Sequence, residues 1–320
     1  MNFSTFNNLN QSIKNLQNYF LQLTDWVFVY VSGNDAKKYL QTKFTININK
    51  FNNNTHTICS HCNSQGKVLS VFYFFVFKSG YGYIQRKSVA RQQIQELEKY
   101  SIFSDIKIRI KKNYHIIGMY NNKIFNFFKN YFLDVSHKNN SLIKTNFGTI
   151  LYFFRPYKKF LLIVSNKKLN LLYKKFFLKK ILVGNEEWLL SEIKSGFPVI
   201  DLENYAKFFP QNINLKKLKA LDFYKGCYQG QEIISRLEFR GKNKYSIYIL
   251  YGNYTDNLVI GENIEKKKKD SWIHCGFILS AVKINSNGIY IQAMLRKTTN
   301  KYDILRINNI KNIFFYLKKY

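Results

Sequence analysis

The chain has 320 residues, of which 46% are hydrophobic, so it is long enough for two or three domains and apolar enough for a large packed core. This composition excludes wholesale disorder, and the longest apolar run, residues 71–77, is far shorter than the ~18 residues of a membrane-spanning helix. The N-terminal stretch is polar and lacks the apolar segment of a signal peptide, so we expect a cytoplasmic protein without membrane association.

The net charge of +31 is compatible with nucleic-acid binding, because lysine and arginine neutralise phosphates. However, 42 of the 50 basic residues are lysines, and Asn, Ile, Phe and Tyr are also abundant. All these residues have AT-rich codons, so a compositional bias of the genome explains most of the lysines without selection for binding. The longest lysine run, residues 266–269, is expected in a solvated loop. Charge alone therefore leaves direct RNA contact open.

The first expected elements lie in residues 26–44, which begin with an apolar run typical of a strand. Asn34 or Asp35 then caps a helix that carries Tyr39 and Phe44 on one face.

The elements that follow mix strands and helices. In chain order they are two strands around a Lys-Ser-Gly turn (67–86), a helix (88–100), a strand (105–110), another strand (160–165), a helix (166–177) and a short helix that ends at Gly196 (186–195). Their order lacks the regular alternation of a doubly wound sheet, so residues 1–240 are assigned to the α+β class.

The composition changes near Gly241, and short alternating apolar segments dominate the rest of the chain. They cover residues 245–252, 275–284, 288–295 and 312–317, with turn residues such as 285–288 between them. Several short strands and no convincing helix predict a small sandwich or barrel over residues 241–320.

The four cysteines are Cys59, Cys62, Cys227 and Cys275. They are too few for a disulfide framework at this length, and reduced thiols are expected. Residues 56–62 read HTICSHC, which has the spacing of half a zinc site, with His56 and His61 beside the two cysteines. Only residues 274–275 are available as a second half. Burial of the thiols in a strand is simpler, and no metal is expected.

Two tryptophans allow two interpretations. Trp26 begins a strand and Trp188 lies near the start of a helix. Buried tryptophans usually pack in cores, and the alternative is a stacking surface for a flat heteroaromatic ligand.

Residues 225–236 read KGCYQGQEIISR, and Cys227 stands in them between a cation and two glycines. Lys225 and a helix start downstream both favour the thiolate, while the glycines permit a tight turn. The order of residues is not that of a phosphate-binding loop. These features favour an accessible and partly activated thiol, although a lone cysteine near a lysine is more often inert.

The same twelve residues resemble the signature of the YgfZ family, K-G-C-Y-x-G-Q-E-x-x-x-R. The matching positions are Lys225, Gly226, Cys227, Tyr228, Gly230, Gln231, Glu232 and Arg236. Residues 33–45, 61–70 and 196–215 resemble other stretches of the family. Its members are similar to the folate-dependent T-protein of glycine cleavage, so the resemblance implies two interleaved α+β subdomains in residues 1–240 and a C-terminal β-barrel in residues 241–320.

The resemblance also implies a function. It points to a protein that binds folate, as tetrahydrofolate or a one-carbon derivative, and that supports tRNA modification and the maintenance of iron–sulfur enzymes, with a link to the control of replication initiation. Partners would be tRNA-modifying or iron–sulfur enzymes. The two folate-contacting tryptophans of the family fall on Trp26 and Trp188, which favours the stacking interpretation for both. A lysine-rich rim suits the anionic glutamate tail of folate.

One departure from T-protein bears on the chemistry. T-protein carries an acidic pair where this chain has Ser70 and Val71, which disfavours aminomethyl transfer. The favoured hypothesis is an accessory factor without turnover of its own, in which Cys227 is a functional thiol. The alternatives are a folate-dependent one-carbon transferase with Cys227 as the catalytic nucleophile, and a basic RNA-binding module.

Overall fold

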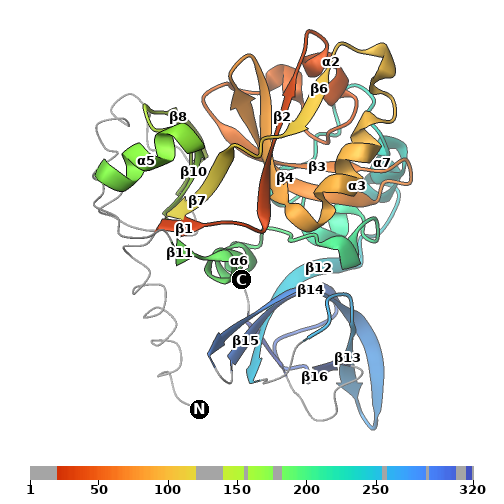
Figure 1. Ribbon diagram of the computed structural model, residues 1–320. Coiled ribbons are helices and arrows are strands. Elements are labelled where there is room, and N and C mark those ends of the chain that lie inside the picture. Colours follow the sequence, from red (N-terminus) through yellow and green to blue (C-terminus); the bar gives the residue numbers. More distant parts are fainter. Residues whose placement is uncertain are drawn as a thin grey trace.

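The computed structural model describes residues 20–119, 140–154, 158–175, 182–253, 258–285, 288–307 and 315–318. These residues form three sheets with helices packed around and between them (Figure 1). Among them, no helix is both long enough and apolar enough to cross a bilayer.

The first two sheets are interleaved along the chain. The first has the strand order β11 (Leu182–Val183), β1 (Phe20–Gln22), β7 (Tyr114–Met119), β10 (Lys159–Ser165), β9 (Thr149–Phe153) and β8 (Ser141–Lys144). The second has the order β3 (His56–Cys62), β4 (Val68–Phe77), β5 (Gly80–Arg86), β2 (Trp26–Ser32) and β6 (Lys107–Ile110). The chain starts in the first sheet with β1, builds the second with β2 to β6, and returns to the first with β7. The expected interleaved α+β arrangement is therefore confirmed.

The third sheet is built entirely from residues after Gly241. Its order is β16 (Leu305–Ile307), β13 (Asn263–Lys268), β14 (Ser271–Asn285), β15 (Gly288–Arg296), β12 (Tyr245–Asn253) and β17 (Tyr316–Lys318). An isolated antiparallel bridge between Leu305 and Phe315 joins the two outer segments. The strands expected at 245–252, 275–284 and 288–295 are present, whereas part of 312–317 lies outside the described residues.

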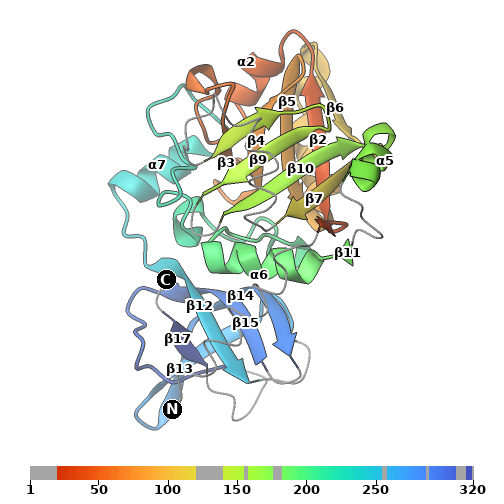
Figure 2. The same cartoon turned by 90° about the vertical axis from the view of Figure 1, so that its left-hand side faces the viewer.

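Five helices are described. They are α2 (Ala36–Gln41), α3 (Lys87–Glu98), α5 (Asn166–Lys175), α6 (Asn185–Ser195) and α7 (Gln231–Phe239). Helix α3 covers the second sheet because Val89, Ala90 and Leu97 lie on its buried face. Helix α6 ends at Gly196, whose φ of 73° is left-handed as expected, and it contacts β1 and the long strands β14 and β15 (Figure 2).

Two local expectations are wrong. The lysine run at 266–269 is not a solvated loop, because Lys266, Lys267 and Lys268 belong to β13. The strand pairs with β16 and β14 on its two sides despite its charge, and Ile264 is its one buried residue. The helix after Asp35 ends at Gln41, and Phe44 is buried beyond it in a bridge to His61.

A single cluster of buried side chains connects the three sheets. It includes Leu21 from the first sheet, Phe28 and Val71 from the second, and Leu279 and Met294 from the third. This shared core fixes the position of the loop that precedes α7.

Candidate functional site

The loop that carries Cys227 lies where the motif-bearing stretches of the sequence meet. The backbone N–H of Gln229 donates to the Thr42 carbonyl at 3.0 Å, and that of Asp222 donates to the Thr45 carbonyl at 2.8 Å. From the stretch at 196–215, the Gln211 amide donates to the Ile234 carbonyl in α7 at 2.7 Å. Segments far apart in the sequence therefore hold this loop from several sides.

The side chain of Lys225 anchors the loop from inside the protein. Its side chain is buried, and its ammonium donates to the carbonyls of Phe44 at 2.6 Å and Ile46 at 2.7 Å. The same ammonium lies 5.0 Å from the centre of the Tyr228 ring. Burial lowers the pKa of Lys225 to about 8. Backbone carbonyls thus hold the ammonium inside the protein, and its effect on Cys227 remains a prediction.

The four thiols fall into two classes. All four cysteines lie in the described part of the chain, and Cys227 is exposed while Cys59, Cys62 and Cys275 are buried. Burial raises the pKa of each buried thiol to about 12, and the nearby Lys225 only partly offsets this for Cys59. The two cysteines of the HTICSHC stretch are therefore packed residues of β3. Within the described residues, no group of three or more His, Cys, Asp or Glu side chains is placed to hold a metal ion.

Gly230 explains why the loop turns so tightly. Its φ is 79°, and a Cβ atom there would lie 2.4 Å from the Asn63 carbonyl oxygen and 2.8 Å from the Cα of Gly66. Only glycine fits this approach between the loop and the β3–β4 turn. Gln231 then accepts a hydrogen bond from the backbone of Tyr228 at 2.9 Å as α7 begins. The remaining charged motif residues, Glu232 and Arg236, are exposed on α7.

A pocket of about 620 Å³ adjoins the loop, within the usual range for small-molecule sites. It is lined by Ile46, Asn47, Lys50, Phe51, Asn52, Thr55, His56, Thr57, Asn140, Lys219, Leu221, Asp222, Phe223 and Tyr224. Aromatic rings, two lysines and one carboxylate are thus present together. The lining residues 219–224 directly precede Lys225 and Cys227 in the chain.

His56 gives the pocket a buried polar group. Its side chain is 2% exposed, and its Nε2 lies 2.9 Å from the Tyr152 carbonyl. A carbonyl only accepts, so Nε2 carries the proton and Nδ1 is an acceptor. Burial lowers the pKa of His56 to about 4, which keeps the ring neutral. Nδ1 is buried and has no hydrogen-bond partner among the described residues.

The two predicted folate tryptophans lie in the core rather than in the lining of this pocket. Trp26 is 3% exposed and Trp188 is fully buried. Aromatic contacts nevertheless lead from His56 to both of them. The ring-centroid distances are 4.5 Å from His56 to Phe153, 6.5 Å from Phe153 to Trp188, 6.1 Å from His56 to Tyr73, 4.7 Å from Tyr73 to Phe197 and 6.0 Å from Phe197 to Trp26. Their assignment to folate remains a prediction.

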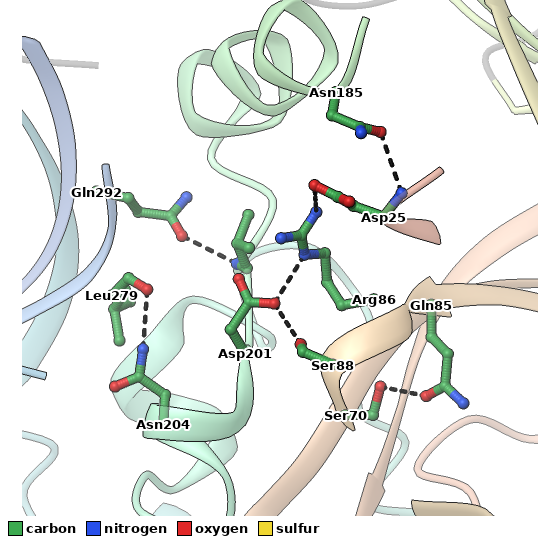
Figure 3. A network of polar contacts seen from close by, with 11 residues as sticks. Asp25, Ser70, Gln85, Arg86, Ser88, Asn185, Asp201, Asn204, Leu279 and Gln292 are labelled. Atoms are coloured by element: carbon green, nitrogen blue, oxygen red, sulfur yellow. Dashed lines mark hydrogen bonds and ion pairs between the residues drawn. The ribbon is translucent and has the colours of Figure 1, made fainter. Parts of the chain in front are cut away.

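Next to Trp26, an ionic network joins the end of β5 to residues before β2 and after α6 (Figure 3). Arg86 lies 5.6 Å over the indole and donates through Nε to Asp201 at 2.9 Å, and Ser88 donates to the same carboxylate oxygen. Arg86 also lies 3.9 Å from the carboxylate of Asp25. This network ties the segment after α6 to the end of β5.

Two amides extend the network to the third sheet. Gln292 accepts from the backbone of Val199 at 2.9 Å and donates to the Phe197 carbonyl at 2.7 Å. Asn204 donates to the Leu279 carbonyl at 2.8 Å (Figure 3).

Trp188 is positioned by a buried ion pair that sequence reasoning missed. Lys159 donates to Glu192 at 2.9 Å, and its ammonium lies 4.6 Å from the centre of the Trp188 ring. The Tyr73 hydroxyl donates to the other oxygen of Glu192 at 2.6 Å. The sequence contained one sign of this pair, because Glu192 is a charged residue on an otherwise apolar face of α6. Its partner Lys159 lies 33 residues away, and no local pattern indicated the pairing.

Ser70 takes part in a buried chain of neutral groups. Its hydroxyl donates to Gln85 at 2.6 Å, and Gln85 donates to Gln93 at 2.9 Å. Gln93 in turn contacts His61 at 3.1 Å. The hydrogen bonds described for Ser70 and its neighbours therefore connect neutral side chains.

Comparisons with known proteins agree with the architecture. The family model described as the YgfZ β-barrel domain matches residues 243–310. The tRNA-modifying protein YgfZ of Buchnera aphidicola subsp. Schizaphis graminum is 44% identical over 91% of this chain and 92% of its own length. That of Yersinia pestis strain Pestoides F is 31% identical over 90% and 88%.

Among solved structures, the aminomethyltransferase T of the glycine cleavage system from Bartonella henselae is similar with a TM-score of 0.74, over 96% of this chain and 87% of that one. At 8% identity this likeness shows the fold alone. With relatives at this level of identity along most of its length, the chain belongs to the YgfZ family.

Proposed function

We propose that this protein is a folate-binding accessory factor in the modification of certain tRNAs, and that it acts without turnover of its own. The relatives that match about nine-tenths of this chain are named tRNA-modifying proteins. A contribution to iron–sulfur enzymes, and through the tRNAs to replication initiation, belongs to the same proposal. The two-part division at residues 240 and 241 is part of it too, with folate held by the first part.

The pocket lined by residues 219–224, which precede Cys227 in the chain, is the observation that carries the folate proposal. Flat pterin and aminobenzoyl rings suit the aromatic side chains of Phe51, Phe223 and Tyr224. Lys50 and Lys219 suit the carboxylates of the glutamate tail.

The residues of the chain have separable roles in this proposal. When bound, the folate supplies a carrier of one-carbon units. The pocket orients it, and the buried ammonium of Lys225 keeps the loop in place. Cys227 is then an exposed thiol on the loop that follows the pocket residues 219–224.

Titration with tetrahydrofolate, followed by tryptophan fluorescence and by equilibrium dialysis, tests folate binding. Lys50→Gln with Lys219→Gln should weaken binding about threefold to tenfold, because two exposed charge contacts are lost. The matched control is Lys78→Gln with Lys144→Gln, which removes equal charge from another pocket. Failure of the parent to bind in dialysis contradicts the proposal.

The tryptophans need a separate variant pair. Replacement of either by alanine should weaken folate binding by about 1–3 kcal/mol if it contacts the ligand. Since both are buried, alanine also costs roughly 3–5 kcal/mol of folding stability, so Trp26→Phe and Trp188→Phe come first. If both folded variants bind folate like the parent, the tryptophan assignment is wrong while the pocket assignment stands.

The exposure of Cys227 favours one alternative, a one-carbon transferase with this thiol as nucleophile. Product formation from a methylene- or formyl-folate that is abolished by Cys227→Ser would establish this alternative. Binding without product formation supports the accessory role.

A further inference from the structure

A second hollow, of about 430 Å³, lies at the junction between the α+β region and the third sheet. It is lined by Lys67, Lys207, Phe208, Phe209, Asn212, Leu237, Lys242, Asn243, Lys244, Tyr245, Gly261, Phe277 and Met294. We call this hollow the lysine groove. It draws on the β3–β4 turn, the segment before α7, the last turns of α7 and strands β12, β14 and β15.

The lysine groove is positively charged throughout. Four lysines line it, and there is no carboxylate among its described lining residues. Lys67 is half-buried, lies 3.6 Å from the centre of the Phe209 ring and donates to the Lys207 carbonyl at 3.2 Å. Partial burial lowers the pKa of Lys67. A cation that has lost part of its hydration gains more from pairing with an anion than a fully solvated one.

The charge continues beyond the lining. Tyr245 in β12 pairs with Arg296 in β15, and the backbone of Lys297 donates to the Lys244 carbonyl at 2.8 Å. The side chains of Arg296 and Lys297 are both exposed. The groove therefore lies at the end of a longer basic strip, which matches a polyanion better than a single small anion.

Aromatic rings and amides stand among the lysines. Phe209 and Tyr245 are half-buried, so part of each side chain remains accessible. The amide of Asn243 holds the wall of the groove in place, because it donates to the Gln211 carbonyl at 2.7 Å and accepts from the backbone of Tyr245 at 3.0 Å. Lysines for phosphates and rings for base stacking are the components of a single-stranded nucleic-acid site.

We propose that the lysine groove binds RNA directly, with backbone phosphates on Lys207, Lys242 and Lys244 and an unstacked base against Phe209. This rests on the proposed role in tRNA modification and adds to it a physical contact with the RNA. Codon bias accounts for the number of lysines in the chain but not for their assembly with aromatic rings at this junction.

Helix α7 connects the lysine groove with the Cys227 loop. The helix begins at Gln231, directly after the Cys227 loop, and leads toward the third sheet (Figure 2). Its Leu237 lines the lysine groove. Nine residues at about 1.5 Å each make the helix about 13 Å long. RNA in the groove is thus held about one short helix away from Cys227.

Fluorescence anisotropy with a labelled, unmodified tRNA transcript tests the proposal on the full-length protein. The groove variant combines Lys207→Gln, Lys242→Gln and Lys244→Gln, all at exposed positions. Loss of three phosphate contacts should lower the salt slope of log K by about two and weaken binding at least about tenfold near 0.1 M salt.

The matched control combines Lys78→Gln, Lys144→Gln and Lys168→Gln. These three exposed lysines line a different pocket, beside β8 and β9, and their removal changes the net charge equally. Binding by the control variant should stay within about threefold of the parent. Phe209→Leu should weaken binding about fivefold without changing the salt slope, because stacking is not ionic.

Three results would overturn the proposal: no binding of the transcript by the parent, equal loss in both triple variants, or binding of anionic phospholipid vesicles in place of RNA. Tetrahydrofolate binding should be the same in parent, groove variant and control. If RNA binding fails while folate binding persists, only this inference falls. If folate binding alone fails, the proposed function falls and the groove stands.

Discussion

The two ends of helix α7 use lysine in opposite ways. At its start, the ammonium of Lys225 is buried against two carbonyls and an aromatic ring, and the loop above it is held by segments from all over the α+β region. At its end, Lys207, Lys242 and Lys244 are exposed around a groove. The difference teaches that burial, and not the number of lysines, decides whether a charge stabilises the fold or remains available to a ligand.

The largest contrast is expected in thiol reactivity. Cys227 at the start of α7 should react with iodoacetamide at pH 7 at least about a hundred times faster than the other three thiols, because a thiol with a pKa of about 12 is only ~10⁻⁵ ionised there. Mass spectrometry of each cysteine peptide, with and without tetrahydrofolate, measures this. Folate should slow Cys227 if the pocket is its site.

Lys225→Met gives the control for that experiment. Its ammonium points into the protein, so the variant should lose stability more clearly than it loses Cys227 reactivity. A parent in which Cys227 is the slowest of the four thiols would show that it is a packed residue.

The next largest effect is expected in the dependence of folding stability on acidic pH. Burial lowers the pKa of His56 to about 4 and that of His61 to about 3, so the unfolded chain binds these protons first as the pH falls below about 6.5. Stability should therefore fall by up to about 1.4 kcal/mol per pH unit for each histidine, down to pH 4 for His56 and pH 3 for His61. Urea unfolding at a series of pH values measures the slope.

His56→Gln and His61→Gln, made singly, should each flatten that slope. If both variants keep the acid dependence of the parent, the buried histidines are not its cause.

A glycine pair tests how tightly the start of α7 is locked. Gly230→Ala should cost about 2–4 kcal/mol, because the added Cβ meets the Asn63 carbonyl and the backbone is left-handed there. Gly226→Ala should stay within about 0.5 kcal/mol, since nothing lies within 4 Å of its Cβ position. Chemical unfolding of both variants gives the difference, and equal stability would disprove the interlocked loop.

The smallest effect is expected from the lysine run in β13. Lys266 pairs with Asp303 at 3.0 Å and the next three lysines are exposed, so Lys→Gln at all four should cost about 1 kcal/mol of stability or less. Folate binding should be unchanged and RNA affinity should fall by about threefold at most. A loss as large as that of the groove variant would mean that charge acts without regard to position.

Local signals predicted much of this structure. The stop at Gly196, the turn between β4 and β5, the helix after Gly230 and the change of composition at Gly241 all depend on neighbours in the sequence. The family signature also marked the loop that the structure shows as interlocked. The exposure of Cys227 agrees with the accessible thiol that its glycines suggested.

Long-range features escaped prediction for a physical reason. The inward direction of Lys225 depends on carbonyls about 180 residues earlier, and the pairing of Lys159 with Glu192 depends on how α6 packs. The lysines of β13 were misassigned because strand pairing with β14 and β16 overrides their polar composition. Burial of both tryptophans likewise follows from the meeting of three sheets.

The interleaving of the first two sheets has a consequence during synthesis on the ribosome. Strand β1 is made first, yet its neighbours β7 and β11 end at Met119 and Val183. Until those residues have emerged, β1 offers unpaired backbone groups to any other chain nearby. Non-local pairing of this kind also slows folding. The risk of aggregation is therefore concentrated in the nascent chain before β11 appears, and single substitutions that delay the closure of this sheet should lower the yield of folded protein more than its final stability.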